Sequence, residues 1–214
     1  VEISVERGQL ARAGRDRDGV WLTGVVTSRF DVTQFGNGGV LGLKFRPGGF
    51  AAWSGIPADQ LTDRVEPAGD RLPGMDRLAN LPLAASESAS VMLDSVLASA
   101  AAAARIPALV EEALALLAEP ALTRVDQLAH RCGCSVRTLQ RTVRHYVGVS
   151  PKWLVRRQRM HDAVAALDAD TGEGLAELAA RLGWYDQNQF GRDFARLVGM
   201  TPSAYRHRLD VADR

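Results

Sequence analysis

Cysteine, lysine and aromatic residues are all scarce in this sequence of 214 residues. Its two cysteines, Cys132 and Cys134, are two positions apart, where a disulfide would be strained. Two thiols are also too few for a zinc site made of cysteine alone. Such usage is typical of a reducing compartment, so we expect a cytoplasmic protein without disulfides. No stretch has the pattern of a signal peptide.

Long apolar runs are missing as well. The longest weakly polar stretch, residues 91–110, contains Asp94 and Arg105 and consists mostly of alanine. It is too polar for a membrane span, so we expect no membrane partner. Histidine is absent from residues 1–119. A metal-dependent dioxygenase or isomerase built on a β-barrel needs histidine ligands, so we expect no enzyme, no metal and no cofactor.

The distribution of charge divides the chain. Residues 120–214 hold 15 lysines and arginines against 10 acidic residues, whereas residues 1–119 hold 11 against 15. Only Lys44 and Lys152, two of the 26 basic residues, are lysines. The net charge of +1 by itself points to no partner. The asymmetry, however, indicates a basic C-terminal module that follows an acidic N-terminal one.

The first fifty residues have the pattern of β-strands. Apolar residues alternate over residues 1–5 and 40–45, and residues 20–27 form a β-branched and aromatic run. Glycine-rich segments separate these runs, and we expect residues 36–39 to form a hairpin loop. The runs predict a small antiparallel sheet or barrel, of which an eight-stranded form would need more chain before Val1.

Helical patterns take over from Phe50. We expect three short helices and two longer ones at residues 50–54, 58–61, 74–80, 87–104 and 106–117. Pro107 fits the first turn of the last helix, and the alanine-rich stretch before it favours helix by propensity. The two longer helices are candidates for dimerisation or for relaying a signal.

The C-terminal part contains an internal repeat with a period of about 50 residues. Residues 128–133 correspond to residues 178–183, and residues 147–154 correspond to residues 198–205. Between these anchors each copy holds one amphipathic segment of helix length. Each copy therefore has the pattern of a helix, a short turn with glycine and a second helix, which is a helix-turn-helix unit.

Individual residues give physical reasons for this pattern. Gly133 and Gly183 can take the positive φ that the turn requires. Ser135 and Asp186 stand where each second helix should begin, and Asp186 with Gln189 has the spacing of a capping box. The apolar positions that we expect to face the core are Val136, Leu139, Val143 and Tyr146 in the first copy and Phe190, Phe194 and Leu197 in the second.

The opposite faces of the second helices carry the side-chain types that bind base edges, because Arg, Gln and Asn can bind bases bidentately in the major groove. The expected exposed positions are Arg137, Thr138, Gln140, Arg141 and Arg144 in the first copy and Gln187, Asn188, Gly191, Arg192 and Arg196 in the second. Between the copies, residues 151–167 predict one helix that would fix the separation of two reading heads. Adjacent major grooves on one face of DNA lie about 34 Å apart.

Taken together, residues 106–208 resemble the DNA-binding domain of the AraC/XylS family of bacterial transcription regulators. The resemblance is strongest over residues 178–206, which follow the family pattern A-x-x-x-G-[FY]-x-[DS]-x-[SN]-x-F-x-R-x-F and then G-x-[ST]-P-x-x-[YF]-R. The sequence departs from it at Trp184, where Phe or Tyr is usual, but keeps an aromatic ring. The resemblance implies that bases are read by Arg137, Gln140, Arg141, Gln187, Asn188 and Arg192, and that phosphates are bound by Arg144 and Arg196.

A second resemblance concerns the N-terminal part, where a subgroup of these regulators has a cupin-like sensor domain. The end of that domain is similar to residues 40–50, residues 56–58 and Leu61 of this sequence. This similarity implies a sensing or dimerising role without identifying an effector. The predicted fold class is α+β, with a partial antiparallel, cupin-like β-region before an all-α domain of two helix-turn-helix units joined by a linker helix. The predicted parts are a sensor region at 1–57, a helical connector at 58–105 and a DNA-binding domain at 106–214. Within the DNA-binding domain, we expect the two helix-turn-helix units at about 124–147 and 174–198, with the linker helix at 151–167 between them.

The resulting hypothesis is a sequence-specific transcription regulator that inserts two recognition helices into successive major grooves and is controlled through its N-terminal region. Double-stranded DNA is the expected partner of a cytoplasmic, nucleoid-associated protein. RNA polymerase, a second copy of the chain and a small-molecule effector stay open as further partners, as does the choice between activator and repressor. Two alternatives remain, a small-molecule-binding protein in which DNA binding is secondary and a protein–protein adaptor.

Overall fold

The computed structural model describes residues 1–12, 18–28, 32–80, 91, 94–95, 97–98, 105–119, 122–169 and 172–212. The chain separates into two units. The N-terminal unit comprises residues 1–110 with 141–149, and the C-terminal unit comprises residues 111–140 with 150–214.

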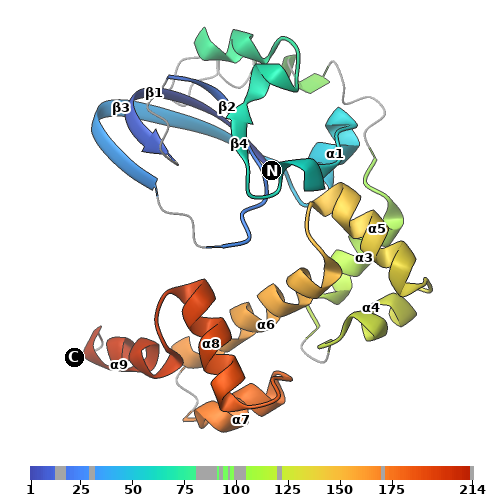
Figure 1. Cartoon of the computed structure of the whole chain (residues 1–214), viewed down its shortest axis with the longest axis vertical. Helices are drawn as coiled ribbons and strands as arrows, with labels where there is room; N and C mark the ends of the chain where they lie inside the picture. Colours follow the sequence, from blue (N-terminus) through green and yellow to red (C-terminus); the bar gives the residue numbers. More distant parts are fainter. Residues whose placement is uncertain are drawn as a thin grey trace. The chain divides into compact units, whose positions relative to one another are not determined.

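The N-terminal unit is built on an antiparallel sheet (Figure 1). Its strands are β1 (Glu2–Arg12), β2 (Gly19–Thr23), β3 (Val32–Lys44) and β4 (Val65–Pro67), in the order β3-β1-β2-β4. Ile3 of β1 lies between Leu22 of β2 and Leu43 of β3, so directly paired apolar residues share one face of the sheet. The expectation of an antiparallel sheet in this region is confirmed.

Two details of the sheet differ from the sequence prediction. The glycine-rich residues 36–39 lie inside β3 and do not form a hairpin loop, because Gly38 and Gly39 pair with β1 next to a shift of register between Gly8 and Leu10. Strand β2 ends at Thr23 and not at residue 27.

The reason for the early end of β2 is the close approach of another segment at Gly24. A Cβ atom at Gly24 would lie 1.7 Å from the carbonyl oxygen of Leu61, and the Gly24 amide donates to the carbonyl of Arg64 at 3.0 Å. Strand β2 therefore ends directly before a residue that has no side chain.

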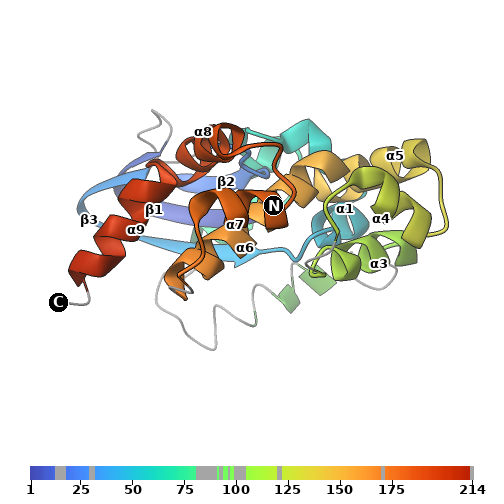
Figure 2. The same ribbon diagram turned by 90° about the horizontal axis from the view of Figure 1, so that it is seen from below.

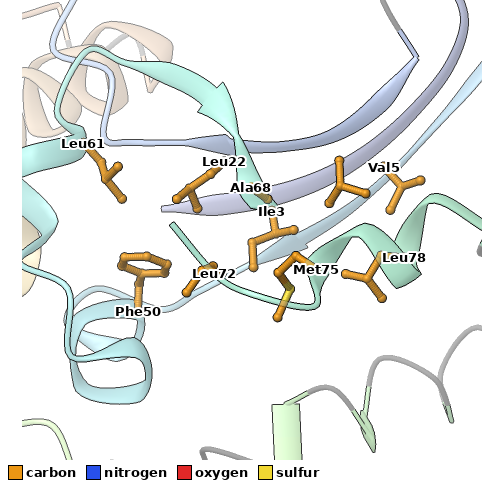
Figure 3. Close-up of a cluster of buried hydrophobic side chains, with 10 residues drawn as sticks. Ile3, Val5, Leu22, Phe50, Leu61, Ala68, Leu72, Met75 and Leu78 are labelled. Carbon is orange, nitrogen blue, oxygen red and sulfur yellow. The ribbon is translucent and has the colours of Figure 1, made fainter. Parts of the chain in front are cut away.

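Short helices cover the apolar face of the sheet. They are α1 (Gly49–Ser54) and the 3₁₀ helices η1 (Ala58–Leu61), η2 (Ala68–Asp70) and η3 (Met75–Asn80), which agree with three of the predicted helices. Figure 3 shows Ile3 and Val5 of the sheet together with Met75 and Leu78 of η3 in one cluster. Burial of these side chains and of Phe50 provides most of the apolar core of this unit.

The second face of the sheet also carries buried side chains, three of them polar beside Trp21. Ser4 is fully buried, and Glu6 and Thr23 are each 4 % exposed. The Ser4 hydroxyl donates to Oε1 of Glu6 at 2.8 Å, and the buried Thr23 hydroxyl has no partner among the described residues. Because β1 alternates, these polar residues lie opposite the apolar cluster of Ile3 and Val5.

The helix predicted at residues 87–104 lies mostly outside the described residues. The residues that are described within it, Val91, Asp94, Ser95, Leu97 and Ala98, are helical. The Trp53 indole of α1 donates to the carbonyl of Leu97 at 3.1 Å.

The remaining elements are helices, drawn in green to red in Figures 1 and 2. They are α3 (Ala108–Leu116), α4 (Val125–Arg131), α5 (Val136–Val147), α6 (Pro151–Asp168), α7 (Leu175–Arg181), α8 (Gln187–Val198) and α9 (Pro202–Ala212). Helix α6 is the predicted linker helix, and it contacts α4, α7 and α9. No helix within the described ranges is long and apolar enough to cross a membrane.

Candidate nucleic-acid interface

Helices α4 and α5 form the first helix-turn-helix unit. Gly133 in the turn has φ +61°, and the Cys134 amide donates to the carbonyl of Ala129 at 3.0 Å. Ser135 caps α5 as predicted, because its hydroxyl oxygen accepts from the Thr138 amide at 3.1 Å. Ala129 is buried, as a close approach of the two helices requires.

Helices α7 and α8 repeat this arrangement in the second unit. Gly183 has φ +80°, and the following Trp184 amide donates to the carbonyl of Ala179 at 2.8 Å. The Asp186 carboxylate caps α8 by accepting from the Gln189 amide at 2.6 Å. The Gln189 side chain reaches back to accept from the amide of Tyr185, the residue before the cap, at 3.3 Å, and not from the Asp186 amide as a capping box requires.

An aromatic cluster holds α8 in place. Phe190 and Phe194 are fully buried, and Trp184 is almost fully buried. The ring centroids of Trp184 and Phe190 are 4.9 Å apart in a tilted arrangement, and those of Phe194 and Tyr205 of α9 are 5.6 Å apart in the edge-to-face arrangement that aromatic pairs prefer. The rotation of α8 about its own axis is therefore fixed by its buried face.

Two of the four apolar residues predicted for the core of α5 are buried, and Tyr146 is partly buried. Leu139 and Val143 are buried, whereas Val136, expected in the core, is 38 % exposed. Val136 is the first residue of α5, one turn before Leu139.

All eight predicted contact residues have exposed side chains, and they lie in two groups. Arg137, Gln140, Arg141 and Arg144 are spaced by three or four residues on α5, so they share one face of that helix. On α8, Gln187 and Asn188 lie in the first turn, and Arg192 and Arg196 follow Asn188 at intervals of four. The structure thus brings each group together on its own helix, and their contacts with bases or phosphates stay a prediction.

Each unit has an ion pair at the end of its first helix. Arg131 and Arg181, at corresponding positions of the repeat, bind Glu119 and Glu173 respectively. Arg181 binds both carboxylate oxygens of Glu173, at 2.8 and 2.7 Å. The hydrogen bonds from these guanidinium groups hold the pKa of the Glu119 and Glu173 carboxyls below the usual value.

Sequence reasoning missed some residues around α8. Tyr185 is 94 % exposed beside the N-terminus of α8, and the alternation with the buried Trp184 is the signal that would have found it. Arg156 and Arg159 lie on α6, the predicted linker helix. Arg159 lies four residues after the buried Val155 and four before the buried Ala163, which places it beside a buried stripe.

We expect Gly183→Val to destabilise the C-terminal unit by more than about 1 kcal/mol. The left-handed backbone at Gly183 disfavours a β-branched residue, and a Cβ there would lie 3.0 Å from the Thr123 side chain. Chemical denaturation would measure the loss. Gly191→Ala is the matched control, because its Cβ would meet no atom of a described residue within 4 Å and a helical alanine should stabilise α8 by up to about 1 kcal/mol. An unchanged free energy of unfolding in Gly183→Val would contradict the assignment of this turn.

We also expect the stability contributed by the Glu173–Arg181 pair to depend on pH. Because folding lowers the pKa of Glu173, its contribution is present above the ordinary carboxyl pKa of about 4.3 and disappears as pH falls through the lower value of the folded state. The difference in Tm between the wild type and Glu173→Gln should therefore be found at pH 7 and vanish in acid. A difference that is the same at both values would show that the ion pair is not its cause.

Two family models match the chain. One, described as a helix-turn-helix domain, matches residues 128–208, and the other, described as a domain of unknown function (DUF6597), matches residues 1–67. Among solved structures, an AraC family regulator from Rhodopseudomonas palustris has 22% identity and a TM-score of 0.44 over 48% of this chain and 98% of that one. The DNA-binding domain of AdpA, solved in complex with a target DNA, has 30% identity and a TM-score of 0.41 over 49% of this chain and 91% of that one.

Curated relatives match in the C-terminal part of the chain. YkgA of Escherichia coli, whose name describes an HTH-type transcriptional regulator, is 31% identical over 84 residues, which are 39% of this chain and 35% of YkgA. The chain thus spans only about a third of the length of that relative. The regulatory protein SoxS of Escherichia coli is 35% identical over 86 residues, which are 40% of this chain and 78% of SoxS. On this match and on the two helix-turn-helix units, the chain belongs to the AraC/XylS family of bacterial transcription regulators.

Proposed function

We propose that the chain is a sequence-specific DNA-binding regulator that inserts α5 and α8 into successive major grooves. The observation that carries this proposal is the two-sidedness of both helices. Each buries apolar side chains, Leu139 and Val143 on α5 and Phe190 and Phe194 on α8. The opposite face of each helix carries a row of exposed Arg, Gln or Asn side chains.

The exposed side chains suit the chemistry of base recognition. A single α-helix fits the major groove, where arginine pairs with guanine and glutamine or asparagine pairs with adenine through two hydrogen bonds each. In this proposal the base-reading residues are Arg137, Gln140, Arg141, Gln187, Asn188 and Arg192. Arg144 and Arg196 lie further from the N-terminus of their helices and contact phosphates, which position the protein without reading sequence.

The N-terminal unit acts in this proposal as the sensor. Its support is the set of buried polar residues on the second face of the sheet, Ser4, Glu6 and Thr23, which lie out of contact with bulk water. A buried hydroxyl without a partner, such as that of Thr23, gains a hydrogen bond when a polar ligand arrives. A second copy of the chain and RNA polymerase complete the proposed set of partners, in the cytoplasm on nucleoid DNA.

The same buried polar residues favour one alternative function, a small-molecule-binding protein in which DNA binding is secondary. Thermal unfolding of the full chain against a set of small polar molecules separates the two. A molecule that raises the Tm and also changes DNA affinity supports a regulator with a sensor. One that raises the Tm and leaves DNA affinity unchanged supports the alternative.

The test of DNA reading is selection from random duplex DNA by the full chain, with affinity followed against salt concentration. We expect a motif with two blocks one helical turn apart and a steep loss of affinity as salt rises, since each neutralised phosphate releases counterions. A selected motif with only one block would show that α5 does not read bases. No enrichment at low salt would overturn the proposal.

We expect Arg192→Ala to cost about 1–3 kcal/mol on the selected site and to relax specificity at one position. Arg196→Ala, on the same face of α8, should instead weaken binding equally on all sequences and reduce the salt slope by about one. Arg157→Ala on α6, also exposed, is the control for loss of charge alone. Equal losses on specific and random DNA in Arg192→Ala would make Arg192 a phosphate contact.

A further inference from the structure

A pocket of about 420 Å³ lies within the C-terminal unit. Its wall is formed by α6, by the segment that leads into α4, and by the turn and helix of the second helix-turn-helix unit. This volume is within the range of sites that hold small ligands. The predicted DNA contacts do not include any residue that lines it.

The charge of the pocket wall is positive. Four of its residues are cations and two are acids. Both acids are already paired, Asp126 with Arg124 at 2.8 Å and Asp193 with Arg156. Neither Lys152 nor Arg159, the other two cations, has a carboxylate partner at ion-pair distance within the described part of the chain.

Arg159 is held in place by a ring. Its guanidinium carbon lies 4.0 Å from the ring centroid of Trp184, and the Trp184 indole donates to Oδ2 of Asp193 at 3.1 Å. Stacking of this kind fixes the plane of the guanidinium group and the direction of its N–H bonds. Burial of the group lowers the pKa of Arg159, although an arginine stays charged at any ordinary pH.

Several donors of these arginines are buried without an acceptor among the residues that the structure describes. They are Nε and Nη2 of Arg159 and Nε of Arg156. A buried donor that loses water without gaining a partner costs about 1–3 kcal/mol, and more on a charged group. Arg156 and Arg159 therefore hold N–H groups in fixed directions that have no acceptor among the described residues, in a pocket whose wall is positively charged.

We propose that this pocket binds a phosphate group, with Arg159 as the main ligand and with Arg156 Nε and Lys152 as supporting donors. A guanidinium group matches a phosphate through two parallel hydrogen bonds. The two unpaired cations also match the charge of a phosphate monoester, about −1.5 to −2 at neutral pH. The group can belong to a free phosphorylated molecule or to the backbone of bound DNA, since Gln189, which lines the pocket, is adjacent to Asn188 on α8.

The first test is calorimetric titration of the full chain with inorganic phosphate at constant ionic strength. We expect saturable binding that Arg159→Met weakens at least tenfold, because methionine keeps an apolar stem beside Trp184 and removes every donor. Arg157→Met removes one charge from the exposed side of the same helix and should bind like the wild type. Arg159→Lys, which keeps the charge and loses the planar fork, should bind between wild type and Arg159→Met.

One further measurement locates the bound phosphate, and a second tests whether the variants are folded. The indole N–H resonance of Trp184, assigned from Trp184→Phe, should shift as phosphate is added, because its ring stacks on Arg159. Thermal unfolding without phosphate should show that the Arg159 variants are folded. This titration uses no DNA, so its failure is distinct from a failure of the proposed DNA reading.

Titration with the selected DNA distinguishes the two sources of phosphate. If the group belongs to DNA, bound DNA should abolish phosphate binding, and Arg159→Met should reduce the salt slope of DNA affinity by about one. If it belongs to a free molecule, phosphate should bind the DNA complex and the free protein alike. The site is overturned if Arg159→Met equals Arg157→Met in both the phosphate and the DNA titrations.

Discussion

The packing of α8 through its aromatic face is the interaction on which the candidate interface depends. Phe190 and Phe194 are fully buried among residues of α6 and α7, including Met160, Leu167 and Leu178. A helix has no freedom of rotation once one face is buried, because turning it would expose large apolar area. The direction of the exposed side chains of α8 is thus set by side chains that are themselves buried. Positioning by a rigid scaffold is what bidentate recognition of a base requires.

Features set by neighbouring residues could be predicted from the sequence. Gly183, Asp186 and Gln189 act within a few positions of one another, and the turn and cap that they predict are present. The burial of Phe190 and Phe194 followed from helical spacing in the same way. The proposed roles of the exposed residues in reading bases and binding phosphates come from the family resemblance, because the fold alone does not indicate them.

Features set by distant segments could not be predicted. Residues 36–39 have the composition of a turn, yet pairing with β1 holds them in a long strand. The end of β2 is decided by the carbonyl of Leu61, almost forty positions away from Gly24. The N–H groups of Arg159 that lack an acceptor among the described residues are held by the ring of Trp184, 25 positions later in the chain. No local sequence pattern predicts such a contact. Each case needs tertiary contacts, which override local propensity.

The cations on the two exposed helical faces, Arg137, Arg141, Arg144, Arg192 and Arg196, are all arginines. A guanidinium group keeps its charge at every pH that a cell meets, and it is not a substrate for lysine acetylation. The positive potential of these faces is therefore constant. Covalent neutralisation of lysine, a common way to weaken a DNA-binding surface, has no target on either face. Control of these faces through lysine modification is therefore excluded, which leaves devices that cover or move the arginines.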